Sequence, residues 1–376
     1  MAAGGAACFA LYVGLWTAQT LLVRGAVRPN GSYAFDTATV CFFIELLKLA
    51  GALLAIALGC DGAASEPRAC ARVRRALANA PASVPFALPS LLYAGYNLLQ
   101  FVNLSLVPAP AFRTAINVKV LFTALLARCA LPAAQLRGAQ WLALLLLALG
   151  CAVAQLDERL HPISPGAFGL ICLQGGLSSL AGVYTQWLLQ LGAPPASGGG
   201  GGSGSGSGGG SGMRRECGQT ASFGFWERGA FLYAWGAATN GLFLALFRPQ
   251  AASSAGGWFA GYDGRVACIV LNGALSGFST ALLLRRLSAV AKEFANAAEI
   301  LTTALVARAL CETPLPSTLS AGATLVVGAT LMFGAASGAG AAESIAAVKA
   351  RRALHSAERV APGIELQPLI LRAGAV

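Results

Sequence analysis

The chain has 376 residues and a formal net charge of +11, and 56% of its residues are hydrophobic while only 11% are charged. Soluble domains carry about a quarter charged residues, so this composition excludes an ordinary soluble enzyme and a soluble nucleic-acid binder. Because the only histidines are His161 and His355, a metal site or catalytic triad built from histidine is close to excluded.

Apolar stretches follow one another along the chain, and each is long enough to cross a bilayer, which takes about 20 mostly apolar residues. We therefore predict an all-α integral membrane protein with about ten transmembrane helices. The predicted spans are 8–27, 37–59, 84–107, 111–131, 137–156, 165–191, 223–247, 265–286, 291–311 and 317–338.

Arginine-rich loops alternate with sparser ones, and this bias predicts the orientation in the membrane. With an even number of spans, both termini are expected in the cytosol, and the positive net charge then reflects topology. The basic residues assigned to the cytosolic side are Arg68, Arg72, Arg74, Arg75, Arg137, Arg214, Arg215, Arg285, Arg286, Lys349, Arg351, Arg352, Arg359 and Arg372.

The ten cysteines are scattered, mostly inside apolar stretches, and form no CxxC pair or Cys/His cluster. We interpret them as small packing residues, and we expect neither disulfides nor a metal site.

A tract of only glycine and serine, residues 197–212, divides the chain. Such a tract buries nothing and behaves as a flexible coil. We expect residues 1–196 to hold a first five-helix repeat plus the sixth helix, and 197–222 to form a cytosolic linker. Residues 223–340 then complete a second repeat, and 341–376 form a basic cytosolic tail.

The repeat is visible as a self-match. Residues 120–128 (VLFTALLAR) and 300–308 (ILTTALVAR) share six of nine positions, and each copy precedes a proline-containing turn and a further apolar helix. The copies lie five predicted helices apart, so the second is inverted in the bilayer, as in alternating-access transporters. Chance similarity of two Ala/Leu-rich helices is the alternative, but threonine and arginine also match in register.

Three of the four lysines fall within or at the edge of predicted spans: Lys48, Lys119 and Lys292. An ionisable residue in a span is costly and marks function by default. Inversion of the repeat would bring Lys119 and Lys292 to one central cavity, where they would suit an anion with several phosphate oxygens. For Lys292, snorkelling at a helix end is the alternative.

Two carboxylates accompany these lysines. Glu45 lies three residues before Lys48, so the two can pair on one helix face in a structural or gating role. Glu299 occupies the repeat position equivalent to Lys119, where it would balance a cavity lysine or carry a coupling proton. The Gly273–Gly277 pattern is interpreted as helix packing.

Local patterns occur in a fixed order from about residue 37 to 335. They are Glu45-x-x-Lys48-Leu, Leu88-Pro-Ser-Leu-Leu-Tyr93 with Asn97, Val118-Lys119-Val, Gln140-Trp141, Ala181-Gly-Val-Tyr184, Trp258-Phe-x-Gly-Tyr262 and Ala291-Lys292-x-Phe294. This ordered set resembles the nucleotide-sugar transporters of the drug/metabolite transporter superfamily, near the carriers of CMP-sialic acid and UDP-galactose.

The resemblance implies ten helices in two inverted halves, a Golgi or ER membrane, and antiport against a nucleoside monophosphate without a cofactor. It places phosphate-binding lysines at Lys119 and Lys292. Tyr93 and Asn97 match positions near the base, and Ser178 and Tyr233 match further cavity positions. The chain departs from the family where Lys-Gly-Phe-Ser is replaced by Lys292-Glu-Phe-Ala295, which puts sugar specificity in doubt.

The prediction is thus a transporter in the lipid bilayer, not an enzyme, whose partners are a CMP- or UDP-linked nucleotide sugar and a nucleoside monophosphate. A carrier of another organic anion, such as a sugar phosphate, and a non-transporting scaffold of the same fold are the alternatives. A glycosyltransferase ranks last because no DxD occurs and the loops are short. A homo-oligomer is compatible with the sequence.

Overall fold

The computed structural model describes residues 3–28, 33–60, 68–107, 112, 115–130, 136–154, 163–190, 223–248, 257–311 and 317–337. Within these residues all regular structure is helical. The elements are α1 (Ala3–Gly25), α2 (Thr37–Ala57), α3 (Ala69–Ala78), η1 (Ala80–Phe86), α4 (Ala87–Leu106), η2 (Ile116–Val118), α6 (Lys119–Ala130), α7 (Gly138–Ala154), α8 (Pro165–Gln190), α10 (Phe225–Phe247), η3 (Gly257–Phe259), α12 (Gly264–Arg286), α13 (Ala289–Cys311) and the helix Ser317–Ser337.

Several of these helices are built to cross a membrane. Six described helices are long and apolar enough by length and composition: Gly4–Gly25, Thr37–Ala57, Pro165–Gln190, Phe225–Phe247, Gly264–Arg286 and Ser317–Ser337. Helix α7 is apolar but shorter. The all-α membrane class is confirmed at this level, and the total of about ten spans stays a prediction.

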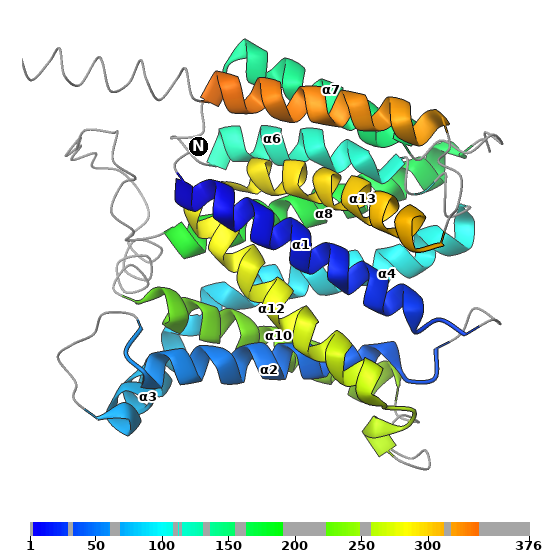
Figure 1. Cartoon of the computed structure of the whole chain (residues 1–376). Helices are drawn as coiled ribbons and strands as arrows, with labels where there is room; N and C mark the ends of the chain where they lie inside the picture. Colours follow the sequence, from blue (N-terminus) through cyan, green and yellow to red (C-terminus); the bar gives the residue numbers. More distant parts are fainter. Residues whose placement is uncertain are drawn as a thin grey trace, which may run out of the picture.

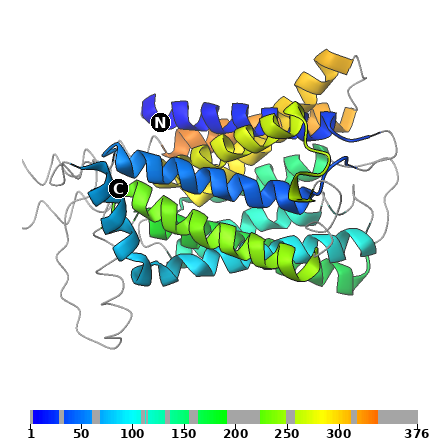
Figure 2. The same cartoon turned by 90° about the horizontal axis from the view of Figure 1, so that it is seen from below.

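The helices pack in a pattern of matched pairs (Figure 1). Helix α1 lies along α12 as α8 lies along α4, and α1 contacts α13 as α8 contacts α6. Helix α2 packs on α12 as α10 packs on α4, and α2 and α10 run side by side (Figure 2). These contacts therefore have an exchange symmetry. If α1 is swapped with α8, α2 with α10, α4 with α12 and α6 with α13, each of these contacts becomes another of them or remains the same.

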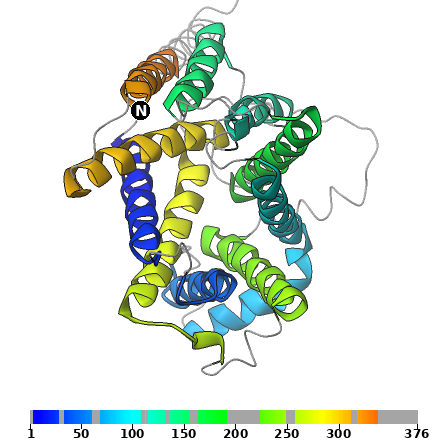
Figure 3. The same ribbon diagram turned by 90° about the vertical axis from the view of Figure 1, so that its right-hand side faces the viewer.

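Viewed from the end of the bundle, α13 reaches from α1 to α6 (Figure 3). The largest group of buried side chains surrounds this junction and includes Ala124, Leu144, Phe294 and Leu301. Helix α13 thus packs against both α1 and α6. Lys119 of α6 and Glu293 of α13 meet at this junction.

Glycines allow α7 and the helix Ser317–Ser337 to pack closely. A Cβ on Gly322 would lie 2.5 Å from the backbone nitrogen of Ala154, and one on Gly150 would lie 2.9 Å from the Cβ of Leu325. These glycines therefore let α7 and the helix Ser317–Ser337 approach closely. The Gly273–Gly277 pattern also packs as predicted, because Gly273 lies against Ile44 and Gly277 lies against Lys48, both on α2.

The segment before α12 folds back on the start of α2. Gly261 has a φ of +74°, and a Cβ there would lie 1.9 Å from the carbonyl oxygen of Ala34, so only glycine fits. The hydroxyls of Tyr262 and Thr39 are 3.0 Å apart, and the rings of Phe43 and Phe259 stack at 4.8 Å. The Trp258-Phe-x-Gly-Tyr262 motif thus closes this end of the bundle.

The arginine-rich loop after α2 contains an element that the spans did not predict. Residues Ala69–Ala78 form α3, and Arg72 donates to the carbonyl of Ala57 at the end of α2. The arginine thereby satisfies a terminal carbonyl of α2, and α3 leads through η1 into α4. Cys8 and Cys151 are buried, but Cys41, Cys129 and Cys268 are free and exposed, so the expected core role is wrong for these three.

Candidate functional site

Lys119 begins α6 and lies inside the bundle. Its side chain keeps 22% of its surface exposed. Gly175 on α8 allows this placement, because a Cβ there would lie 3.3 Å from the Cβ of Lys119. The lysine therefore lies where α6 and α8 approach each other, and its ammonium end retains accessible surface.

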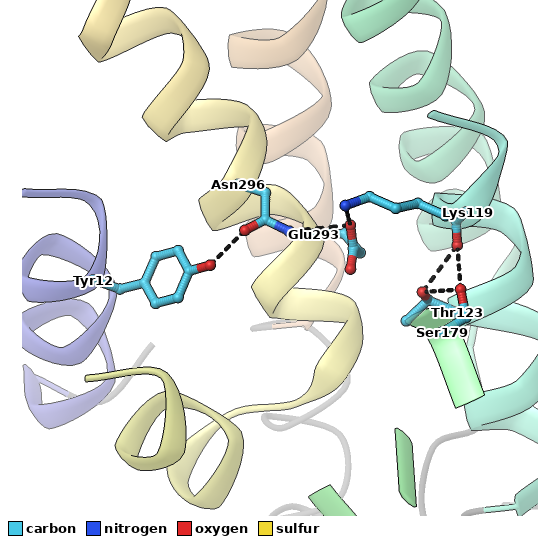
Figure 4. A network of polar contacts seen from close by, with 6 residues as sticks. All are labelled: Tyr12, Lys119, Thr123, Ser179, Glu293 and Asn296. Atoms are coloured by element: carbon cyan, nitrogen blue, oxygen red, sulfur yellow. Dashed lines mark hydrogen bonds and ion pairs between the residues drawn. The ribbon is translucent and has the colours of Figure 1, made fainter. Parts of the chain in front are cut away.

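The backbone at Lys119 is held by two hydroxyls. Thr123 and Ser179 both donate to the carbonyl of Lys119, at 2.9 and 3.0 Å, and their hydroxyls lie 2.9 Å apart (Figure 4). Thr123 is 2% exposed and Ser179 is 3% exposed. These buried bonds fix the start of α6 against α8, so the lysine projects from a firm base.

The ammonium of Lys119 points toward Glu293 on α13 (Figure 4). Its nitrogen lies 3.5 Å from Oε2 of Glu293, whose side chain is only 7% exposed. The same oxygen accepts a hydrogen bond of 3.3 Å from Asn296, and Asn296 in turn accepts one from the hydroxyl of Tyr12 on α1. One polar chain thus crosses α1, α13, α6 and α8.

Lys292 and Glu299 lie on a different face of α13 from Glu293. Residues 292, 296, 299 and 303 recur at helical spacing, and Asn296 and Glu299 of this stripe form hydrogen bonds with α1. Glu299 accepts hydrogen bonds of 2.8 Å from Thr20 and 3.0 Å from Thr303. Lys292 is half-buried, and no ion pair of it occurs among the described residues. The carboxylate at Lys119 is therefore Glu293, and the predicted role of Glu299 as its counter-charge is not seen.

A second charged centre lies between α2, α10 and α12. Lys48 pairs with Glu45 at 2.6 Å, and its nitrogen stands 4.8 Å from the ring centroid of Tyr233, which is a cation–π contact. A Cβ on Gly236 would lie 2.7 Å from Glu45, and one on Gly277 would lie 2.4 Å from Lys48. Tyr233 is therefore in contact with this centre.

Exposure separates outer from inner helix faces. Leu54, Leu106 and Leu242 are 60%, 57% and 59% exposed, as expected for side chains that face lipid. Each of these leucines lies nine residues after a predicted site residue. The site residues are, in the same order, Glu45, Asn97 and Tyr233. Nine residues correspond to about two and a half helical turns, so these three residues point inward.

Asn97 is exposed even though it points inward, and Tyr93 is half-buried one turn before it on α4. Ser178 is half-buried on α8, next to the buried Ser179. The inner faces of α4 and α8 therefore retain accessible polar surface. The structure brings Lys119, Glu293, Thr123 and Ser179 into direct contact. Within the described regions, no hydrogen bond or ion pair joins Lys119 to Tyr93, Asn97, Ser178 or Lys292.

Glutamines of α8 tie the end of the bundle where α12 ends and α13 begins. Gln190 donates to the carbonyls of Leu284 and Leu287 at 2.8 and 3.2 Å, and Gln186 accepts from the backbone of Ala289 at 2.7 Å. Arg228 of α10 donates to the carbonyls of Leu188 and Leu189, both at 3.3 Å. These bonds satisfy helix-terminal groups that have no partner within their own helix.

Sequence reasoning singled out Lys119 but missed Tyr12 and the two glutamines. It noted Glu293 as a departure from the glycine of the family pattern, but it did not predict a role for this residue. Its partner depends on the contact between α6 and α13, and no local pattern reveals that contact. Chemically, the site offers a cation with accessible surface, a competing carboxylate, and hydroxyls that hold the backbone, which suits reversible binding of an anion.

Comparison with known proteins shows which family the sequence matches. A family model described as nucleotide-sugar transporter matches residues 6–190 and 218–334, and the gap between them contains the Gly/Ser tract. The chain is 25% identical over 315 residues to CMP-sialic acid transporter 4 of Arabidopsis thaliana, covering 82% of this chain and 79% of that protein.

Two further similarities point the same way. The chain is 24% identical to the UDP-galactose transporter senju of Drosophila melanogaster, over 82% of this chain and 80% of that protein. A crystal structure with 16% sequence identity superposes with a TM-score of 0.56, over 87% of this chain and 95% of that chain. At this identity the structural likeness shows the fold alone.

Proposed function

Since the chain belongs to the nucleotide-sugar transporter family, we propose that it exchanges a cytosolic CMP- or UDP-linked nucleotide sugar for a lumenal nucleoside monophosphate across the Golgi membrane. Both termini then lie in the cytosol. The observation that carries the proposal is Lys119, a partly exposed lysine inside an apolar bundle, at the contact of α6 with α13. An intramembrane cation of this kind suits a phosphate group of the substrate.

Alternating access follows from the predicted inverted repeat. The exchange symmetry of the helix contacts supports this repeat, because α6 and α13 contain the two copies and meet each other. In such transporters the substrate binds between the halves near the bilayer midplane. Lys119 belongs to the first half and Glu293 to the second, which agrees with a binding site at their junction.

The predicted substrate-binding residues fit around this junction as part of the same proposal. Lys119 and Lys292 would contact phosphate oxygens, while Tyr93 and Asn97 on the inner face of α4 would contact the base. Ser178 would line the same space from α8. Tyr233 on α10 would also contact the substrate, and its ring lies against Lys48 of the Glu45–Lys48 pair. That pair would then transmit helix movement and not touch the substrate.

Exchange in liposomes tests the proposal. Purified protein is reconstituted in vesicles preloaded with CMP, UMP or GMP, and uptake of a panel of radiolabelled nucleotide sugars is measured. We expect uptake that requires one matching internal monophosphate. Uptake of a sugar phosphate that ignores the base would favour the other-anion carrier. Absence of exchange with every substrate in sealed vesicles would leave the scaffold of the same fold.

A further inference from the structure

Glu293 competes with any anion for Lys119. The ammonium and the carboxylate are 3.5 Å apart, longer than the 2.7–2.9 Å typical of a charge-assisted hydrogen bond. The lysine keeps 22% of its side chain exposed, whereas Glu293 is 7% exposed and is held by Asn296. The pair is therefore loose, and its accessible partner is the cation.

The pair also joins the two halves of the chain. Lys119 is fixed to α6 and α8 through Thr123 and Ser179, and Glu293 is linked through Asn296 to Tyr12 of α1. A movement of α13 relative to α6 must stretch or break the ion pair. Breaking it without a substitute leaves the buried carboxylate of Glu293 without its cation, which is unfavourable.

On the basis of the proposed transport function, we propose that Glu293 is an internal counter-anion that holds the empty carrier closed until the phosphate of a substrate displaces it from Lys119. The phosphate of a nucleoside monophosphate carries more negative charge than a carboxylate and offers three acceptor oxygens, so it is a suitable competitor for Lys119. Its negative charge also repels Glu293, so the two anions cannot share the lysine at low cost. Displacement frees α13 from α6, and this ties helix movement to the presence of substrate.

Glu293→Gln tests the proposal because glutamine keeps the size of the side chain and removes its charge. The first measurement is the Kd for CMP and UMP on purified protein. The second is the ratio of uptake into empty vesicles to uptake into vesicles preloaded with the matching monophosphate. We expect a Kd about tenfold lower, since an ionic contact of about 1.4 kcal/mol need no longer be displaced, and a higher ratio. A purely structural role would weaken binding and lower both uptakes together.

Glu227→Gln is the matched control. Glu227 closes the first turn of α10 by accepting from the backbone of Gly224 at 3.1 Å, a role that glutamine also performs. This variant should keep both the Kd and the uptake ratio of the wild type. If Glu293→Gln does not yield folded protein, Glu293→Asp replaces it, because the shorter carboxylate weakens the pair and should lower the Kd in the same direction.

The outcomes separate the two proposals. Wild-type protein that binds no nucleotide and exchanges no nucleotide sugar overturns the proposed function. Wild-type exchange together with an unchanged Kd and an unchanged uptake ratio in the Glu293 variants overturns the counter-anion and leaves the transport function intact.

Discussion

In the part of the chain that the structure describes, two ion pairs inside the bundle differ in construction. Glu45 and Lys48 are three residues apart on α2 and lie 2.6 Å from each other. Their side chains pack closely against Gly236 and Gly277, where a Cβ atom would collide with them. Lys119 and Glu293 come from α6 and α13 and lie 3.5 Å apart. The first pair moves with its helix as one body, while the second must change whenever the two helices move.

The difference teaches which pair can respond to a ligand. In the tight local pair with a cation–π contact to Tyr233, the lysine is the less exposed partner, since Lys48 is 12% exposed and Glu45 is 20% exposed. The looser pair leaves more of its lysine accessible, at 22%. We therefore assign packing and transmission of movement to the pair on α2 and ligand contact to the pair across α6 and α13.

Removing Lys119 should have the largest effect on nucleotide-sugar exchange and should distinguish the two ion pairs most clearly. Lys119→Met is expected to lower nucleotide-sugar exchange about 100-fold or more, because loss of one charge of a buried pair costs about 2–5 kcal/mol and removes the phosphate ligand. Liposome exchange and nucleotide Kd provide the measurement. Lys48→Met should slow exchange but keep the Kd within about threefold, since its partner lies on the same helix. Equal loss of nucleotide affinity in both variants would contradict the assignment.

Removing both charges should separate stability from binding. Lys119→Met leaves Glu293 buried without a cation, so thermal unfolding in detergent should occur at a lower temperature. Adding Glu293→Gln removes the unpaired charge and should restore about 2–3 kcal/mol of the lost stability. Nucleotide binding should remain absent in the double variant. Recovery of binding would show that Lys119 is not the phosphate ligand.

Disturbing the pair on α2 should have a smaller effect. Gly277→Ala places a Cβ 2.4 Å from the Cδ of Lys48, so the side chain must shift. We expect exchange to slow by about threefold to tenfold at an unchanged Kd, equivalent to about 1 kcal/mol of strain. Gly328→Ala is the control, because a Cβ there meets nothing within 4 Å in the described structure. An equal effect of both substitutions would point to a general loss of packing.

The smallest expected effect is a difference in how fast a water-soluble reagent labels two cysteines. Cys41 is exposed one turn before Glu45 on α2, whereas Cys268 is exposed on the same stripe of α12 as Leu271 and Leu275. A charged thiol reagent should label Cys41 faster than Cys268, and the matching nucleotide should slow the labelling of Cys41. Mass spectrometry of wild type and Cys41→Ala measures this. Preferential labelling of Cys268 would reverse the assignment of inner and outer faces.

The helical class, the approximate spans and Lys119 were accessible from the sequence because each depends on local composition. A charge inside an apolar stretch is visible without any knowledge of the fold. The helix α3 and the 3-10 helix η1 were not predicted, since short elements in a basic loop lack the length of a span.

The partner of Lys119 was not predictable from local pattern. The internal repeat matches Glu299 to Lys119 in sequence, but repeat equivalence describes symmetry and not proximity. Glu293 lies six residues earlier on α13, about one and two-thirds turns away, and faces α6 instead of α1. Likewise, Tyr233 was grouped with the substrate by resemblance, and its contact with Lys48 emerges only when α2 lies against α10.

The placement of the two ion pairs also bears on synthesis. Helix α2 carries both members of its pair, so it can enter the bilayer during translation with its charges already compensated. Helix α6 has Lys119 at its start and Arg128 in its last turn, while its carboxylate partner is made much later, on α13. A lone lysine at the centre of a span costs about 2.5–3.5 kcal/mol on insertion scales. Helix α6 is therefore expected to need its neighbour α7, or a delay until α13 is made, before it settles in the membrane.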